Sequence, residues 1–158
     1  EGAVVSNNIL NDVAFGISVT NFDVGGRMAL VTGNVIRRVT GGTADGVTAG
    51  GAIHAEADTL VANNVIEDAK DFGISLGWGD KTRNLSAEGN LLRNCNRSIT
   101  ASVTQGAGSI QIVNNVIASH KGPAIVGMDY LEVETEDLAA TGAKIPANLA
   151  VNGNMVTP

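Results

Sequence analysis

The sequence predicts an all-β solenoid, in which short parallel strands stack into coils, and three observations support this fold class. A motif of two polar residues followed by two apolar residues recurs along the chain. Polar and apolar residues alternate within short segments, as they do in half-buried strands. No segment shows a sustained helical period. Sequence repeats of about 20 to 50 residues are typical of solenoids.

An asparagine anchors each repeat. The anchors follow one another at spacings of 26, 30, 26, 25 and 39 residues, and the residue before each one is Asn or Gly. Both residue types tolerate left-handed backbone angles, so we expect a sharp corner before every anchor. We also expect the stacked amides to bond backbone groups at that corner. The six pairs are Asn7-Asn8, Gly33-Asn34, Asn63-Asn64, Gly89-Asn90, Asn114-Asn115 and Gly153-Asn154.

Two strands flank each corner, and a third follows in most coils. The position three residues before the anchor and the position two after it are apolar in every repeat, as a core ladder requires: Val5, Val31, Val61, Ala87, Ile112 and Val151 before, and Leu10, Ile36, Ile66, Leu92, Ile117 and Val156 after. The third strands are expected over residues 15–19, 52–56, 72–76, 97–101 and 124–127. The predicted architecture is a single-stranded right-handed parallel β-helix of about five to six coils with loop insertions.

We expect residues 1–158 to form a single β-helix domain, interrupted by two longer insertions. The glycine-rich segment 41–51 lacks the Lys-Ser/Thr that a phosphate-binding loop needs after its last glycine, so it is expected to be a surface loop. The chain begins at Glu1 without a start methionine or a signal peptide, and we expect it to be part of a longer β-helix.

The longest insertion covers residues 128–148. Its acidic stretch around Thr135 and Asp137, with Gly142 beyond, predicts the start and the end of a short helix.

Composition and charge exclude several classes of function. The net charge of −6 would repel the phosphates of a nucleic acid. No apolar run approaches the ~20 residues of a membrane span. One cysteine, Cys95, makes neither an internal disulfide nor a thiolate zinc cluster, and its position in the repeat predicts an inert core thiol. No cofactor motif is present, so we expect no cofactor.

One face of the third strands carries the strongest candidate site. Strand alternation sends His54, Glu56 and Asp58 to one side, with His54 between Ser18 and Ser75 of the neighbouring coils. Thr100 extends this polar row, and Trp78 and Asp80 begin the loop of the next coil. Sugars bind such surfaces by stacking on an aromatic ring and by hydrogen bonds from their hydroxyls to carboxylates.

These residues carry the predicted chemistry. The predicted catalytic residues are His54, Glu56 and Asp80: Glu56 with Asp80 or Asp58 as a glycosidase carboxylate pair, or His54 as the base of an elimination. The predicted substrate-binding residues are Ser18, Ser75, Trp78 and Thr100. The alternative is a polar strand face that meets water, so the sequence leaves open whether the protein is an enzyme.

We predict no metal site. Oxygen ligands for calcium do gather near one corner, at Glu67, Asp68 and Asp71, but the twelve-residue calcium loop is absent.

A different class of function follows from an apolar row. The residue after each anchor points outward by alternation and is apolar in every repeat: Ile9, Val35, Val65, Leu91, Val116 and Met155. Such a stripe favours a covering partner, which would be a second copy, the remainder of a parent chain, or the 128–148 insertion. On this hypothesis the protein is a non-catalytic structural or assembly scaffold.

The Asn-Asn-Val-Ile and Gly-Asn-Val-Ile motifs and the Phe-Gly-Ile-Ser strand at 72–75 resemble the pectate-lyase-like superfamily of right-handed β-helices. The sequence looks closest to an exported bacterial family of twin-arginine-translocated β-helix repeats of unknown function. This resemblance implies an exported, periplasmic or extracellular protein that binds or processes acidic polysaccharide. The polygalacturonase-like Asn-Thr-Asp, Gly-His-Gly and Arg-x-Lys motifs are absent, so the resemblance implies no particular reaction.

Overall fold

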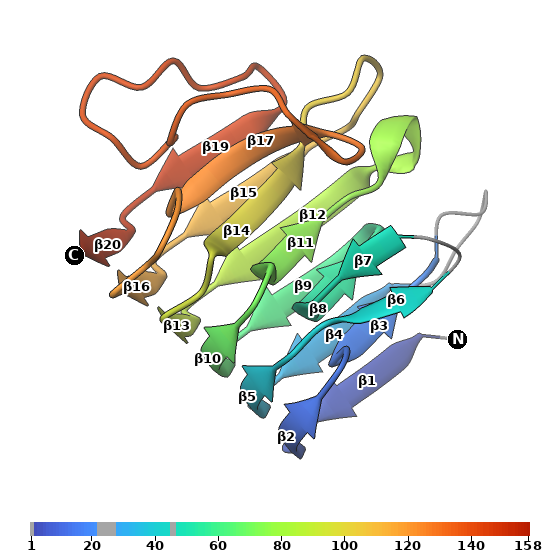
Figure 1. Cartoon of the computed structure of the whole chain (residues 1–158). Coiled ribbons are helices and arrows are strands. Elements are labelled where there is room, and N and C mark those ends of the chain that lie inside the picture. The colour runs from blue at the N-terminus through green and yellow to red at the C-terminus, as the bar shows by residue number, and fades with distance from the viewer. Residues whose placement is uncertain (1, 22–27, 45–46) are drawn as a thin grey trace.

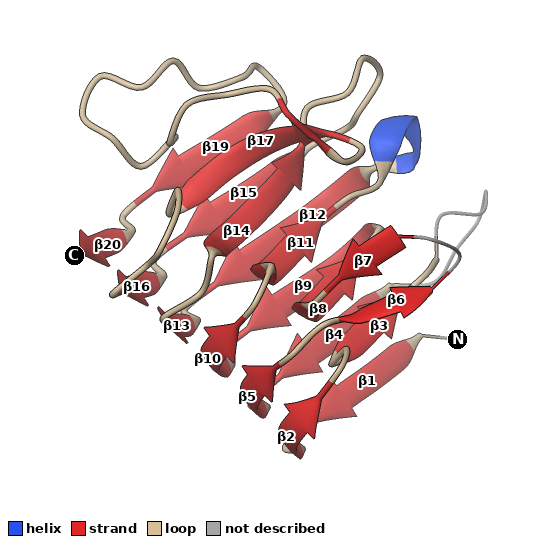
Figure 2. Cartoon of the chain, viewed as in Figure 1, coloured by secondary structure: helices blue, strands red, loops and turns tan. Residues whose placement is uncertain are grey.

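The protein is a right-handed parallel β-helix, seen in a computed structural model that describes residues 2–21, 28–44 and 47–158 (Figure 1). Three sheets run along the helix axis and enclose one apolar core. The predicted fold class, with three strands in each coil, is confirmed. Within the described ranges, the one helical element is the 3-10 turn η1 (Gly79–Lys81), and no helix is long and apolar enough to span a membrane (Figure 2).

Each sheet contains equivalent strands from successive coils, paired in parallel. Sheet A comprises β1 (Ala3–Ser6), β4 (Ala29–Thr32), β9 (Ala57–Ala62), β12 (Arg83–Glu88), β15 (Ile110–Val113) and β19 (Leu149–Asn152). Sheet B comprises β2 (Ile9–Val13), β5 (Val35–Val39), β10 (Val65–Ala69), β13 (Leu91–Arg93), β16 (Val116–Ala118) and β20 (Met155–Thr157). Sheet C comprises β3 (Ile17–Val19), β8 (Gly51–Ala55), β11 (Phe72–Leu76), β14 (Arg97–Ser102), β17 (Ile125–Asp129) and the short antiparallel β18 (Glu132–Val133).

The corner between sheets A and B is built as the sequence predicts. Every residue that precedes an anchor has a positive φ, between 55° and 67°. Asn64 illustrates the ladder: its Oδ1 accepts hydrogen bonds from the backbone N–H of Asn34 at 3.0 Å and from the Asn34 amide at 2.9 Å. Its own Nδ2 donates to Asn90 Oδ1 and to the Val31 carbonyl, both at 3.0 Å. The amide therefore satisfies backbone groups that a sharp turn would otherwise leave unpaired inside the protein.

Asparagine and glycine alternate from coil to coil at the position before the anchor. A Cβ at Gly33 would lie 2.7 Å from Oδ1 of Asn7, and a Cβ at Gly89 would lie 2.8 Å from Oδ1 of Asn63. Each of these asparagine side chains thus occupies the space that a Cβ would need at the equivalent position of the next coil, and glycine, which has no Cβ, fits there.

A second left-handed corner, between sheets B and C, was not predicted. It lies four residues after the anchor, where Asp12, Arg38, Asp68, Asn94 and Ser119 have φ between 51° and 59°. Three of the five are Asp or Asn, which favour this conformation, but the arginine and the serine mask the pattern. Side chains from neighbouring coils pair across the corner, as Arg38 does with Asp12 at 2.6 Å.

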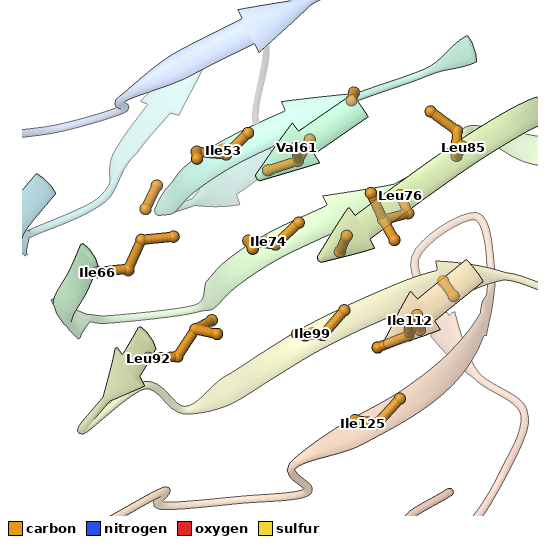
Figure 3. Packing of buried hydrophobic residues seen from close by; sticks show 14 of the residues in the cluster. Ile53, Val61, Ile66, Ile74, Leu76, Leu85, Leu92, Ile99, Ile112 and Ile125 are labelled. Carbon is orange, nitrogen blue, oxygen red and sulfur yellow. The ribbon is translucent and has the colours of Figure 1, made fainter. Parts of the chain in front are cut away.

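The interior is filled by stacked aliphatic residues, as the apolar ladders predict. In Figure 3, Ile53, Ile74, Ile99 and Ile125 follow one another through successive strands of sheet C, and all four are fully buried. Cys95 is also fully buried, and this burial raises the pKa of its thiol to about 11. The thiol is therefore a core residue, as predicted.

The described part of the glycine-rich segment 41–51 contains strands where a surface loop was expected. It contains an antiparallel hairpin of β6 (Gly42–Ala44) and β7 (Val47–Ala49), in which Thr43 pairs with Thr48. The expected loop is thus wrong over these strands, while residues 45 and 46 lie outside the described part of the chain.

The insertion 128–148 closes the C-terminal edge of sheet C, at the top of Figure 1. The short helix predicted there is wrong, because residues 134–148 form turns and irregular chain. The carboxylate of Asp137 accepts hydrogen bonds from the backbone N–H groups of Ala124 at 2.8 Å and Ile125 at 3.1 Å, at the edge that β17 exposes. Leu138 beside it is 4% exposed and joins the core. The segment thereby pairs a strand edge that would otherwise be free to aggregate.

Candidate functional site

A groove of about 450 Å³ crosses the outer face of sheet C. Five parallel strands, β3, β8, β11, β14 and β17, contribute residues to it, together with η1 and the turn between β17 and β18. Besides backbone at several glycines, it is lined by Phe15, Ile17, Ser18, His54, Asp71, Phe72, Ser75, Trp78, Arg97, Thr100, Ser102, Met128, Tyr130 and Leu131. The predicted residues Ser18, His54, Ser75, Trp78 and Thr100 all lie in this one site.

The floor of the groove is a polar ladder in strict register. Ser18 pairs with His54 across β3 and β8, His54 pairs with Ser75 on β11, and Ser75 pairs with Thr100 on β14. Parallel strands lie about 4.8 Å apart, so a hydroxyl or an imidazole recurs at this interval along the helix axis. The floor therefore offers an evenly spaced row of hydrogen-bond donors and acceptors.

Aromatic rings flank the polar floor of the groove. The Trp78 ring meets the Tyr130 ring edge to face at a centroid distance of 5.4 Å, and it meets the His54 ring at 6.3 Å. Phe72 lies on the other side of His54, with ring centroids 6.4 Å apart. Gly79, with a φ of 57°, packs so closely under Tyr130 that any side chain would displace the phenol ring. The predicted aromatic contact at Trp78 is thus one member of a larger cluster.

Phe72 and Arg97 reach the groove because strand alternation is interrupted. On β11 both Gly73 and Ile74 face the core, so Phe72 and Ser75 both face outward. The ring of Phe72 extends over Gly51 of the preceding coil, where any Cβ would overlap it. A strict period of two places Phe72 and the equivalent Arg97 inside, so strand alternation alone does not predict either residue in the groove.

His54 and Glu56 form the deepest polar pair at the site. Nε2 of His54 lies 3.5 Å from Oε1 of Glu56, which is only 7% exposed. Burial lowers the pKa of the imidazole and raises the pKa of the carboxyl group. Oε2 of Glu56 is buried and makes no hydrogen bond to the residues that the structure describes. At neutral pH the groove therefore presents an uncharged imidazole backed by one carboxyl group.

Asp58 does not share a face with this pair, contrary to the prediction. The chain turns between the end of β8 at Ala55 and the start of β9 at Ala57, and Asp58 has a φ of 45°. Its carboxylate instead pairs with Arg83 at 2.7 Å on β12. The prediction failed because it continued one strand through a corner between sheets C and A.

Asp80 is also separate from the groove lining. It lies on η1 with its side chain about half exposed, 3.2 Å from Nζ of Lys81. The carboxylate that does line the groove is that of Asp71, which forms an ion pair with Arg97. The proposed glycosidase pair of Glu56 with Asp80 stays a prediction.

The oxygen ligands considered for calcium are directed to other partners. Glu67 forms an ion pair with Arg93, and Asp68 accepts a hydrogen bond from Asn94. Over residues 2–21, 28–44 and 47–158, no three His, Cys, Asp or Glu side chains are grouped so as to hold a metal ion.

The protonation of His54 gives a pH-dependent prediction. The folded protein takes up this proton at a lower pH than the ordinary histidine value of 6.5, whereas the unfolded chain takes it up near 6.5. Protonation of His54 therefore favours the unfolded state, and its contribution to stability is lost as the pH falls below 6.5. In an NMR titration, we expect the His54 ring to titrate at a lower pH in the native protein than in urea. A native midpoint equal to or above the midpoint in urea would contradict a buried, neutral imidazole.

A family model described as "Right handed beta helix region" matches residues 1–136, a range that contains every residue of the groove. Searches of curated proteins and of solved structures gave no match to the chain.

Proposed function

The chain belongs to the right-handed β-helix family, and from this premise we propose that it binds a carbohydrate chain in the groove over sheet C. The observation that carries the proposal is a polar floor flanked by aromatic rings, with Trp78 and Tyr130 on one side of His54 and Phe72 on the other. Sugar rings have apolar faces that pack on aromatic rings and hydroxyl edges that need hydrogen-bond partners. The aromatic rings meet the first need and the polar floor meets the second.

The shape of the groove supports a chain rather than a single sugar. It extends from β3 to β17, which is four strand spacings or about 19 Å along the axis. The floor repeats its polar groups at the strand interval from β3 to β14, so a polymer lying along the axis meets similar partners over these four strands. A polysaccharide ligand also agrees with export from the cell, which is part of this proposal.

Binding is better supported than processing. A glycosidase needs two carboxyl groups on opposite sides of the scissile bond. Asp71 in the groove is paired with Arg97, and Asp80 lies outside the groove lining. His54 retains the chemistry of a general base, because its imidazole is neutral and reaches the groove.

The proposal is tested by titrating the protein with a panel of polysaccharides. Trp78 is the one tryptophan of the chain and lies at the groove, so bound sugar is expected to change its fluorescence. The melting temperature of the protein in the same mixtures should rise, because a ligand that binds the native state stabilises it. Unchanged fluorescence and unchanged melting across the whole panel would contradict carbohydrate binding.

The scaffold hypothesis keeps a specific observation in its favour. The apolar row of sheet B is exposed at Ile9 (73%), Leu91 (43%) and Met155 (61%), while Val35 and Val65 within it are partly buried. The 128–148 insertion contacts sheet C instead. If copies of the chain associate through this row, sedimentation velocity will give a mass above the 16.1 kDa of one chain. Leu91→Asp should then restore the monomer. A wild-type protein that stays monomeric at all concentrations would contradict self-assembly.

A further inference from the structure

We propose that the groove selects neutral polysaccharides and discriminates against chains of uronic acids. This inference rests on the proposed carbohydrate function and adds the class of ligand to it. It differs from the acidic polysaccharides that the resemblance to pectate-lyase-like proteins implies. The selection follows from the charges that a ligand would meet in the groove.

The guanidinium group in the groove is already neutralised. Arg97 on β14 forms an ion pair with Asp71, the residue just before β11, and both side chains are about one-fifth exposed. Arg97 is the only arginine among the described lining residues, and these residues include no lysine. A ligand carboxylate would have to displace Asp71 from the guanidinium group, so the described lining of the groove offers it no free cation.

The other groups nearby also disfavour anions. His54 is uncharged at neutral pH because of its burial, and Glu56 lies behind it. The β17–β18 hairpin that carries Tyr130 also carries the exposed Glu132. Lys81 beside the groove is 3.2 Å from Asp80. Together with a net charge of −6, this arrangement repels a polyanion and weakens its association.

Neutral sugars match the hydroxyl groups and aromatic rings that also line the groove. Ser18, Ser75 and Thr100 provide hydroxyls that both donate and accept hydrogen bonds, which suits sugar hydroxyl groups. The rings of Phe72, Trp78 and Tyr130 pack against the C–H faces of a pyranose without any charge on the ligand.

The test compares glycans that differ only in the carboxylate. Neutral β-linked glucan, mannan and galactan oligosaccharides are each titrated beside their C6-oxidised uronate forms, with the intact protein, by calorimetry. We expect at least one neutral member to bind at least tenfold more tightly than its uronate form, with little dependence on salt. A uronate form that binds equally or more tightly, and weakens as salt is added, would overturn the inference but leave carbohydrate binding intact. Absence of binding to every member of the panel would instead overturn the proposed function.

One variant isolates the ion pair. Asp71→Asn keeps the shape of the side chain and releases the Arg97 guanidinium, so the affinity for the uronate form is expected to rise severalfold in low salt. Glu67→Gln is the matched control, because it breaks the comparable ion pair with Arg93 on sheet B, outside the groove. Equal uronate affinities for wild type and Asp71→Asn would show that the ion pair is not what excludes carboxylates, and would overturn this basis for selection.

Discussion

Asn64→Ala is expected to lower the free energy of unfolding by about 3 kcal/mol, because it removes the hydrogen bonds of one buried amide and leaves their partners unpaired. Asn64 lies in the middle of the ladder and is 1% exposed. Its loss leaves the backbone N–H of Asn34, which donates to Asn64 Oδ1, without a partner. It also removes the hydrogen bond from the Asn64 side-chain amide to the Val31 carbonyl. Neither group is near solvent that could replace the lost partner.

Urea unfolding followed by circular dichroism measures this effect. The control is Asn96→Ala, in which an exposed asparagine outside the ladder is replaced, and its effect should stay below about 0.5 kcal/mol. Similar midpoints for the two variants would show that the ladder adds little to the stability of the β-helix.

Trp78→Ala is expected to weaken glycan binding by at least tenfold, or about 1.4 kcal/mol. The substitution removes the largest ring of the groove and with it the edge-to-face contact that supports Tyr130. Trp78→Phe keeps an aromatic face and should retain most of the affinity. Calorimetry is the appropriate measurement, since the alanine variant has no tryptophan fluorescence.

The controls separate binding from folding. Trp78 is 38% exposed, so its loss should leave the β-sheet circular dichroism unchanged. Leu91→Ala removes a side chain of similar exposure on sheet B and should leave the affinity unchanged. Equal losses in Trp78→Ala and Leu91→Ala would place the binding site elsewhere.

The fold was predictable because each coil repeats the same local chemistry. A residue that tolerates positive φ, an amide that satisfies the turn, and an apolar residue on either side recur in fixed order, and the structure realises this order at Asn8, Asn34, Asn64, Asn90, Asn115 and Asn154. The alternation within the third strands predicted the floor of the groove, because aligning these strands places Ser18, His54, Ser75 and Thr100 at one outward position. Local chemistry and long-range stacking point to the same structure in these segments.

The rest of the site depends on features that break the repeat. Phe72 faces outward because two successive residues of β11 face the core, and no residue pattern in one strand announces this. Tyr130 reaches the groove from the turn after β17, in an insertion that no other coil repeats. Asp58 was misplaced because the corner at the end of β8 has no glycine or asparagine of its own to mark it. The three-dimensional structure is needed to identify side chains that irregular segments bring together.

Mapping bound glycan onto the protein by NMR is the most direct test of whether the groove over sheet C is the binding site. Isotope-labelled protein is titrated with the tightest neutral oligosaccharide, and the backbone amide shifts are followed. If the groove binds glycan, the shifts will concentrate at Ser18, His54, Ser75 and Thr100 and at the Trp78 indole, along the outer face of sheet C. Shifts confined to the apolar row of sheet B, around Ile9, Leu91 and Met155, would contradict it, as would a saturated complex with no shift in the groove.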